Sequence, residues 1–168
     1  MRYTPAAIAL SMLAAISSSV IHSQVPEQLD PRAQALLAQG SAQIAAGNVQ
    51  GAIDAFESAL TVAPGSSTVL VALADAERRN GLQGKAIHYY RVALANDPRN
   101  LNAIAGEGMA LAEKGAIDKA NRNLARLQSL CGKECAETRK LSAAISRGPS
   151  PRMVTADAVT SKPVVSEN

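Results

Sequence analysis

Aromatic residues are scarce in this sequence of 168 residues, which has no tryptophan, one phenylalanine and three tyrosines. A globular core of ordinary size normally contains more of these large side chains. An array of helices that bury only against their neighbours needs fewer, because alanine and leucine can fill its thin layers. The scarcity therefore favours a repeat architecture over a single large core.

Residues that commonly carry catalysis are also few, with two histidines and two cysteines. His22 falls in a predicted signal segment, so His88 is the only histidine of the predicted mature chain, and we expect it on a helix surface. No nucleophile motif accompanies His88. The glycines are spaced as turn closers rather than as a phosphate-binding loop. We therefore expect neither enzyme activity nor a cofactor.

The longest apolar run near the N-terminus is short, covering about eleven residues from Ala6 to Ile16. It is too short to span a bilayer, but it fits the apolar part of a secretory signal. We predict a signal peptide over residues 1–23, with cleavage after Ser23 or, alternatively, after Ser19. An uncleaved anchor or a disordered apolar tail is the other interpretation. The signal predicts a periplasmic or secreted protein with no membrane span after its removal.

Charge is unevenly distributed along the chain, and basic residues are scarce in its first part. Gln24 to Glu77 contains one basic and six acidic residues, whereas Arg78 to Asn168 contains fifteen basic and eight acidic residues. An elongated molecule would therefore have an acidic front and a basic back. This pattern fits ordinary solvated helix faces, and it also fits steering of a partner or head-to-tail self-association.

A 34-residue period runs from Ala33 to Gly132. The residues that recur at this spacing are Gly40, Ala74 and Gly108; Gly47, Gly81 and Gly115; Ala52, Ala86 and Ala120; Phe56, Tyr90 and Leu124; and Pro64, Pro98 and Gly132. Such a period is the mark of stacked structural repeats. In the middle unit we expect helices over about 67–80 and 85–96. A left-handed glycine cap, Gly81, follows the first helix, and Pro98 ends the second.

At these positions the chain resembles the tetratricopeptide repeat (TPR) family. The middle unit carries the resemblance best, at the signature spacing of Leu70, Leu73, Ala74, Gly81, Ala86, Tyr90, Ala93 and Pro98. The third unit departs from the family pattern at Leu127 and Gly132. The resemblance implies an all-α fold, a right-handed α-solenoid of three helix–turn–helix repeats at 33–66, 67–100 and 101–133. A lead-in at 24–32 precedes these repeats.

Several residues indicate where helices begin. Asp30 before Pro31 is a strong start signal, Ser66 or Ser67 can cap the next unit, and Asn100 and Asp118 can cap helices of the third. After the repeats, residues 134–147 predict one more helix that covers the last unit, as stacked arrays require. Residues 148–168 have no helical period and are expected to be disordered.

Cys131 and Cys135 lie across the turn into this capping helix. Two cysteines four residues apart across a turn can form a disulfide if their α-carbons lie within about 4.4–6.8 Å, and the bond would fix the capping helix to the stack. Free buried thiols are the alternative. A redox or metal role is the weakest interpretation, because the spacing is not Cys-x-x-Cys and no second ligand pair exists for zinc.

The family resemblance also implies where a partner binds, because the first helices of stacked pairs line a concave side. The groove positions carried over from the family are Gln34, Leu37, Ser41, Ile44, Thr68, Val71, Asp75, Arg78, Asn102, Ala105, Met109 and Ala112. The set is mildly apolar and lacks the lysine- and asparagine-rich clamp that some relatives use for a C-terminal carboxylate. We therefore expect an adaptor that holds an apolar helix or extended peptide of another protein, with an envelope, secretion or pilus assembly role. The alternatives are a self-associating structural module and a thiol–disulfide redox protein, and we expect no nucleic-acid partner.

Overall fold

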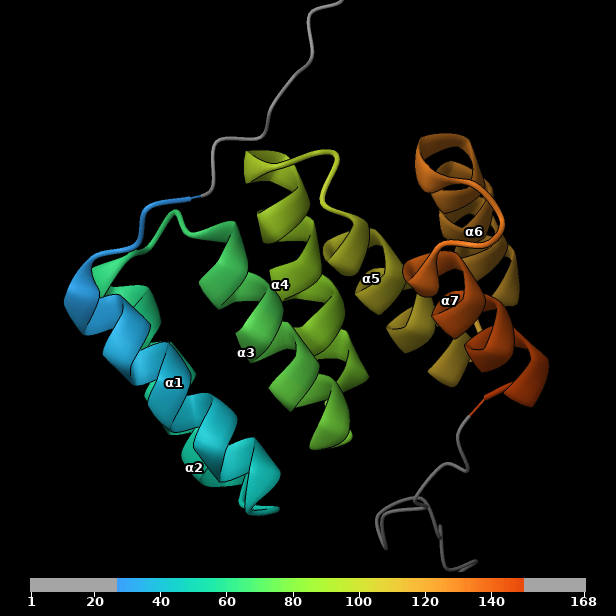
Figure 1. The fold of residues 1–168 in the computed structure, drawn as a ribbon. Helices are drawn as coiled ribbons and strands as arrows, with labels where there is room; N and C mark the ends of the chain where they lie inside the picture. The colour runs from blue at the N-terminus through green and yellow to red at the C-terminus, as the bar shows by residue number, and fades with distance from the viewer. Residues whose placement is uncertain (1–26, 150–168) are drawn as a thin grey trace, which may run out of the picture.

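The computed structural model describes residues 27–149, and in this part the chain is all helical (Figure 1). Its elements are α1 (Pro31–Ala45), α2 (Val49–Val62), α3 (Ser67–Arg79), α4 (Gln83–Asn96), α5 (Leu101–Glu113), α6 (Ile117–Cys131) and α7 (Ala136–Arg147). The helix bounds expected from the sequence differ from these by at most two residues. The predicted signal peptide at 1–23, and the parts of the lead-in and tail beyond 27–149, lie outside the described residues.

Three of the predicted N-caps are confirmed, because each side chain accepts a hydrogen bond from a backbone amide in the first turn. The distances are 2.7 Å for Asp30, 3.1 Å for Ser66 and 3.0 Å for Asn100. The predicted cap at Asp118 is wrong. Helix α6 begins at Ile117, so Asp118 lies inside the first turn, where its carboxylate can interact with the helix dipole but cannot cap the helix.

Helices α1–α2, α3–α4 and α5–α6 form three hairpins, and each hairpin turns at a glycine. Gly47, Gly81 and Gly115 have φ angles of 78°, 79° and 82°, a left-handed conformation that is costly for other residues. The second helix of each hairpin packs against the first helix of the next one, so the pairs follow one another in chain order (Figure 1).

Small residues let helices approach closely at equivalent places in the three layers. Gly40, Ala74 and Gly108 are all buried, each seven residues before its turn glycine. A β-carbon built at Gly40 would lie 2.3 Å from Cε1 of Phe56, and one built at Gly108 would lie 2.6 Å from a methyl carbon of Leu141. The first and third layers therefore depend on glycine, whereas the second accommodates alanine.

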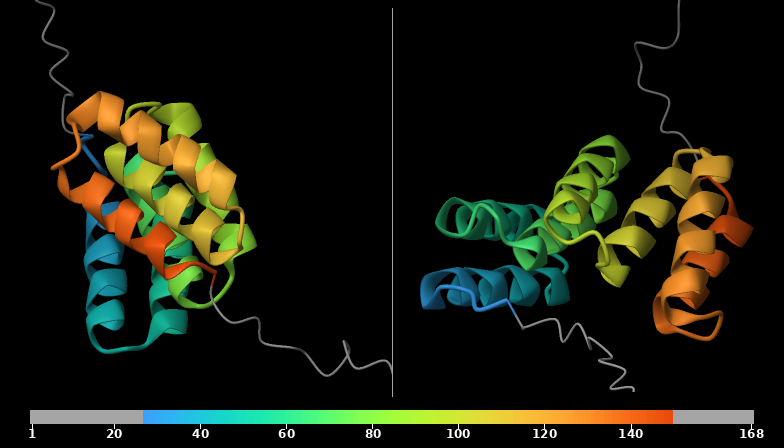
Figure 2. Two further views of the ribbon diagram at one scale, coloured as in Figure 1. Left: turned by 90° about the vertical axis from the view of Figure 1, so that its right-hand side faces the viewer. Right: turned by 90° about the horizontal axis from the view of Figure 1, so that it is seen from above.

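Helix α7 lies against α5 and α6 and closes the C-terminal end of the stack (Figure 2). It buries Thr138, Leu141 and Ala144, while Arg139 and Lys140 are exposed. An apolar inner side and a polar outer side are what a cap for a helical stack needs.

Polar side chains also tie α3 to α4. The fully buried carboxylate of Glu77 lies 2.6 Å from the ammonium nitrogen of Lys85, and this contact raises the pKa of Lys85. Two residues earlier on α3, Asp75 accepts a hydrogen bond from the hydroxyl of Tyr90. These contacts fix the α3–α4 hairpin, on whose first helix much of the candidate site lies.

Candidate partner-binding groove

The first helices of the hairpins, α1, α3 and α5, lie on one side of the stack together with α7 (Figure 1). Ten of the twelve groove positions expected from the sequence are at least partly exposed there. These are Gln34, Leu37, Ser41, Ile44, Thr68, Val71, Asp75, Arg78, Asn102 and Met109. Four of the ten are aliphatic or thioether side chains, so an apolar partner surface can contact this side.

The remaining two positions, Ala105 and Ala112, are buried in the structure and therefore cannot line the groove as expected. They are 2% and 0% exposed, respectively, and lie in apolar clusters that include Ile145 of α7. The family spacing places them on the first helix of the third hairpin, but it does not include a helix that follows the third hairpin and covers α5. The accessible surface is therefore concentrated on α1 and α3, with Met109 at its border.

Two ionisable side chains near this side, Arg78 and Tyr90, have partners within the protein. Arg78 of α3 forms an ion pair with Glu113 of α5 at 2.6 Å, and so joins two layers. Burial lowers the pKa of Arg78, but the opposing effects of Glu113 and Tyr90 are larger in sum, so its pKa is raised and it stays charged. The Tyr90 hydroxyl is kept neutral, because burial and the nearby Asp75 carboxylate raise its pKa.

Between α1 and α3 the surface is hollowed to a volume of about 210 Å³. Residues Ser41, Ile44, Phe56, Ala72, Asp75, Ala76 and Arg79 line this hollow, which we call the α1–α3 pocket. Phe56 and Ala76 are only 3% and 1% exposed, so they form its floor. Asp75 and Arg79 are more exposed and place opposite charges beside this apolar floor.

The expected groove positions include Ser41, Ile44 and Asp75 of this pocket but not its other four residues. Three of these four residues, Ala72, Ala76 and Arg79, lie on α3, and their spacing could have identified them. Ala72, Asp75, Ala76 and Arg79 follow one another at steps of three, one and three residues, which puts them on one helix face. Phe56 carries no such signal, since its ring reaches the pocket only because Gly40 leaves room for it.

At the other end of α3, the lead-in contacts the same helix. One carboxylate oxygen of Glu27 accepts hydrogen bonds from the backbone amide and the hydroxyl of Thr68, at 3.2 and 3.0 Å. A carboxylate at a helix N-terminus is favoured by the free amides and the helix dipole. The expected groove residue Thr68 is thus engaged by the chain itself, which leaves the C-terminal half of α3 as the open part.

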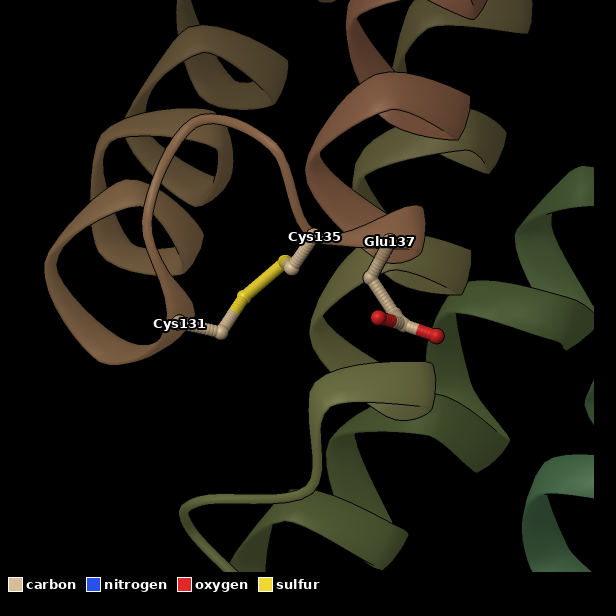
Figure 3. Close-up of side chains that lie close together, drawn as sticks. All are labelled: Cys131, Cys135 and Glu137. Atoms are coloured by element: carbon tan, nitrogen blue, oxygen red, sulfur yellow. A yellow bond between two sulfur atoms is a disulfide. The ribbon is translucent and has the colours of Figure 1, made fainter.

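Cys131 and Cys135 lie at the far end of the stack, between α6 and α7 (Figure 3). Their α-carbons are 5.9 Å apart and their sulfur atoms lie at bonding distance. The hydroxyl of the buried Thr138 donates to the carbonyl of Gly132 at 2.9 Å and lies 3.0 Å from the sulfur of Cys135. The α-carbon separation lies in the range for the predicted disulfide, which stays a prediction.

Glu137 is the third potential ligand near these sulfurs, with a carboxylate oxygen and both sulfur atoms within 4.8 Å of one another. Zinc binds cysteine as the thiolate. Sulfur atoms that are bonded to each other are not thiolates, so this trio offers no thiolate ligand while the bridge exists.

Within residues 27–149, no helix combines the length and the apolar character needed to cross a membrane. Residues 27–67 and 37–100 match the sequence model of the tetratricopeptide repeat. The chain matches none of the curated proteins in sequence.

Several solved structures share the fold. The Sgt2 TPR domain from Aspergillus fumigatus is 24% identical over 71% of this chain and 80% of its own, with a TM-score of 0.65. The yeast Sti1 TPR2B domain, solved as a pHsp70 complex, is 15% identical over 70% of this chain and 96% of its own, with a TM-score of 0.65. The Yersinia enterocolitica type III secretion chaperone SycD, in complex with a peptide of the translocator YopD, is 21% identical over 68% of this chain and 86% of its own, with a TM-score of 0.59.

Proposed function

We propose that the protein is a non-enzymatic adaptor of the tetratricopeptide repeat family that holds a segment of another protein against α1 and α3, since residues 27–67 and 37–100 match the sequence model of that repeat. The observation that carries the proposal is the accessible side of these two helices, where Leu37, Ile44 and Val71 are only partly buried and no described helix covers them. Similar domains have been solved with peptides of their partners, among them SycD with a YopD peptide.

The third hairpin, α5–α6, is proposed as a third repeat that ends the array rather than lengthening the groove. It lies outside the matched residues 27–100 but continues the 34-residue period through Gly108 and Gly115. Helix α7 covers its first helix, so a partner would contact chiefly the first two layers.

We also propose that the adaptor works outside the cytoplasm, in envelope, secretion or pilus assembly. This part rests on the signal-like residues 1–23. A reporter fusion of residues 1–23 to a periplasmic phosphatase tests it, since the phosphatase becomes active only after export. An inactive fusion, with the fusion protein present in the cytoplasm, would refute export.

Photo-crosslinking tests the adaptor itself. A photo-reactive amino acid at Ser41, which is exposed beside the α1–α3 pocket, should trap a specific partner in cells of the native source. The same amino acid at Ser58, which is exposed on α2, is the matched control and should not. The double variant Leu37→Glu/Val71→Glu should abolish the Ser41 crosslink while the helical circular dichroism spectrum is retained. Equal crosslinking from both positions would contradict a groove on the α1–α3 side.

Self-association is the second candidate function, and the charge distribution favours it. Residues 27–66 contain four acids and one base, whereas residues 117–149 contain seven bases and three acids. Opposite charges at the two ends of a stack can attract successive copies, and such contacts weaken with salt. Sedimentation velocity at low and high salt separates the candidates, because only the self-associating module would change its sedimentation coefficient with salt and concentration.

A further inference from the structure

We propose that the α1–α3 pocket selects a partner segment in which an aliphatic side chain stands next to a carboxylate. This inference rests on the proposed adaptor function and specifies the partner's chemistry at one place in the groove.

The size of the pocket points to a single side chain. Its volume of about 210 Å³ lies below the roughly 300–1,000 Å³ typical of small-molecule and cofactor sites. A pocket of this size, open toward the groove and floored by Phe56 and Ala76, can hold one leucine, isoleucine or methionine side chain of a peptide laid across α1 and α3.

The apolar floor decides which kind of side chain enters. Phe56 and Ala76 belong to the same apolar cluster as Leu73, and Ile44 and Ala72 pack against that cluster from the pocket side. A polar side chain placed there would lose water without gaining a hydrogen-bond partner from the floor. An aliphatic side chain would gain from the apolar surface that it removes from water.

The charged residues at the rim of the pocket favour a particular neighbour of that aliphatic side chain. Asp75 is already engaged, because its carboxylate accepts the hydroxyl of Tyr90. Arg78, the preceding cation on α3, is paired with Glu113. Arg79 is exposed, lines the pocket, and forms no ion pair within residues 27–149. Its guanidinium group is therefore the cation at the rim that has no ion-pair partner among these residues, and a carboxylate is its natural partner.

The test uses short acetylated and amidated peptides as probes of the isotope-labelled protein, followed by amide chemical shifts. The reference probe is Gly-Ser-Leu-Glu-Gly-Ser. A second probe has lysine in place of glutamate, and a third has serine in place of leucine. The reference probe should shift the amides of Ala72, Ala76 and Arg79 and bind about two- to fivefold more tightly than the lysine probe, the range expected for one exposed ion pair. The serine probe should produce no saturable shift.

Two pairs of variants separate the contributions of the floor and the rim. Ser41→Leu fills the pocket from α1 and should abolish binding of the reference probe, whereas Ser58→Leu adds the same side chain on exposed α2 and should leave binding unchanged. Arg79→Gln should remove the difference between the glutamate and lysine probes, whereas Arg99→Gln, at the exposed turn before α5, should preserve it.

Shifts that map elsewhere, equal affinity of the glutamate and lysine probes for the unmodified protein, or full binding to Ser41→Leu would overturn the proposal. The crosslinking experiment tests the proposed adaptor function independently of these peptide preferences. If Ser41 still crosslinks a partner specifically while the peptide preferences are absent, the adaptor stands and only the side-chain class is wrong. If the crosslink is also absent, the groove itself is wrong.

Discussion

The substitution Gly40→Ala tests the packing of the first layer more sharply than removal of a large side chain, because the same chemical change elsewhere should act in the opposite direction. A β-carbon at Gly40 would lie 2.3 Å from Cε1, 2.6 Å from Cδ1 and 2.7 Å from Cζ of the Phe56 ring. Real β-carbons do not approach a ring so closely, so the ring or α1 must move. Phe56 is 3% exposed and has little room to yield without disturbing its neighbours.

The magnitude follows from two opposing contributions. Alanine in place of a helical glycine stabilises a protein by up to about 1 kcal/mol, because glycine loses more backbone freedom on folding. Forcing an extra methyl group into a packed site costs about 1–3 kcal/mol. We therefore expect Gly40→Ala to lower the free energy of unfolding by about 1–2 kcal/mol. Gly84→Ala is the matched control, since Gly84 lies in α4 and a β-carbon there meets nothing within 4 Å.

The assay is equilibrium unfolding in urea, followed by helical circular dichroism. Gly84→Ala should raise the midpoint slightly while Gly40→Ala lowers it. The double variant Gly40→Ala/Phe56→Leu should show a coupling of at least about 0.5 kcal/mol relative to the two single variants, because a smaller side chain leaves space for the new methyl group. If Gly40→Ala stabilises the protein as Gly84→Ala does, the close approach of α1 to Phe56 is wrong.

Three further predictions follow from the described contacts. Ala86→Arg should unfold the middle of the stack, because Ala86 is 0% exposed and an arginine there would be a buried, unpaired charge; a native helical signal and melting temperature would contradict this. Burial and the Asp75 carboxylate raise the pKa of Tyr90. The Tyr90 hydroxyl therefore stays protonated in the folded protein at pH values above about 10, where it ionises in the unfolded chain. The stability contributed by this group is therefore present below that pH and is lost as the pH rises, so the wild type should lose more stability between about pH 8 and about pH 11 than Tyr90→Phe does, as urea unfolding at the two pH values will show. For Cys131 and Cys135, thiol titration of the denatured, unreduced protein should find no free thiol, and finding two would refute the disulfide.

The local structure of this protein could be predicted from its residue spacing. The 34-residue spacing of Gly47, Gly81 and Gly115 predicted where the hairpins turn, because a left-handed backbone conformation is a local demand that glycine meets most easily. Ser66 and Asn100 marked helix starts for the same kind of reason, since a capping side chain needs only the amides of the next turn. Ten of the twelve groove positions that the family resemblance implied are accessible, because those positions recur on one face of the first helices.

Which of these helix faces stays accessible depends on contacts between helices that the residue spacing does not report. Ala105 and Ala112 have the same spacing as accessible groove residues of the earlier layers, yet α7 packs over α5 and buries them. The α1–α3 pocket likewise depends on a contact between different helices, since the Phe56 ring reaches it through the space left by Gly40. A repeat period reports contacts within one turn or one hairpin. The sequence predicted that a helix over about 134–147 covers the last hairpin, but which groove positions that helix buries depends on contacts between side chains far apart in the chain.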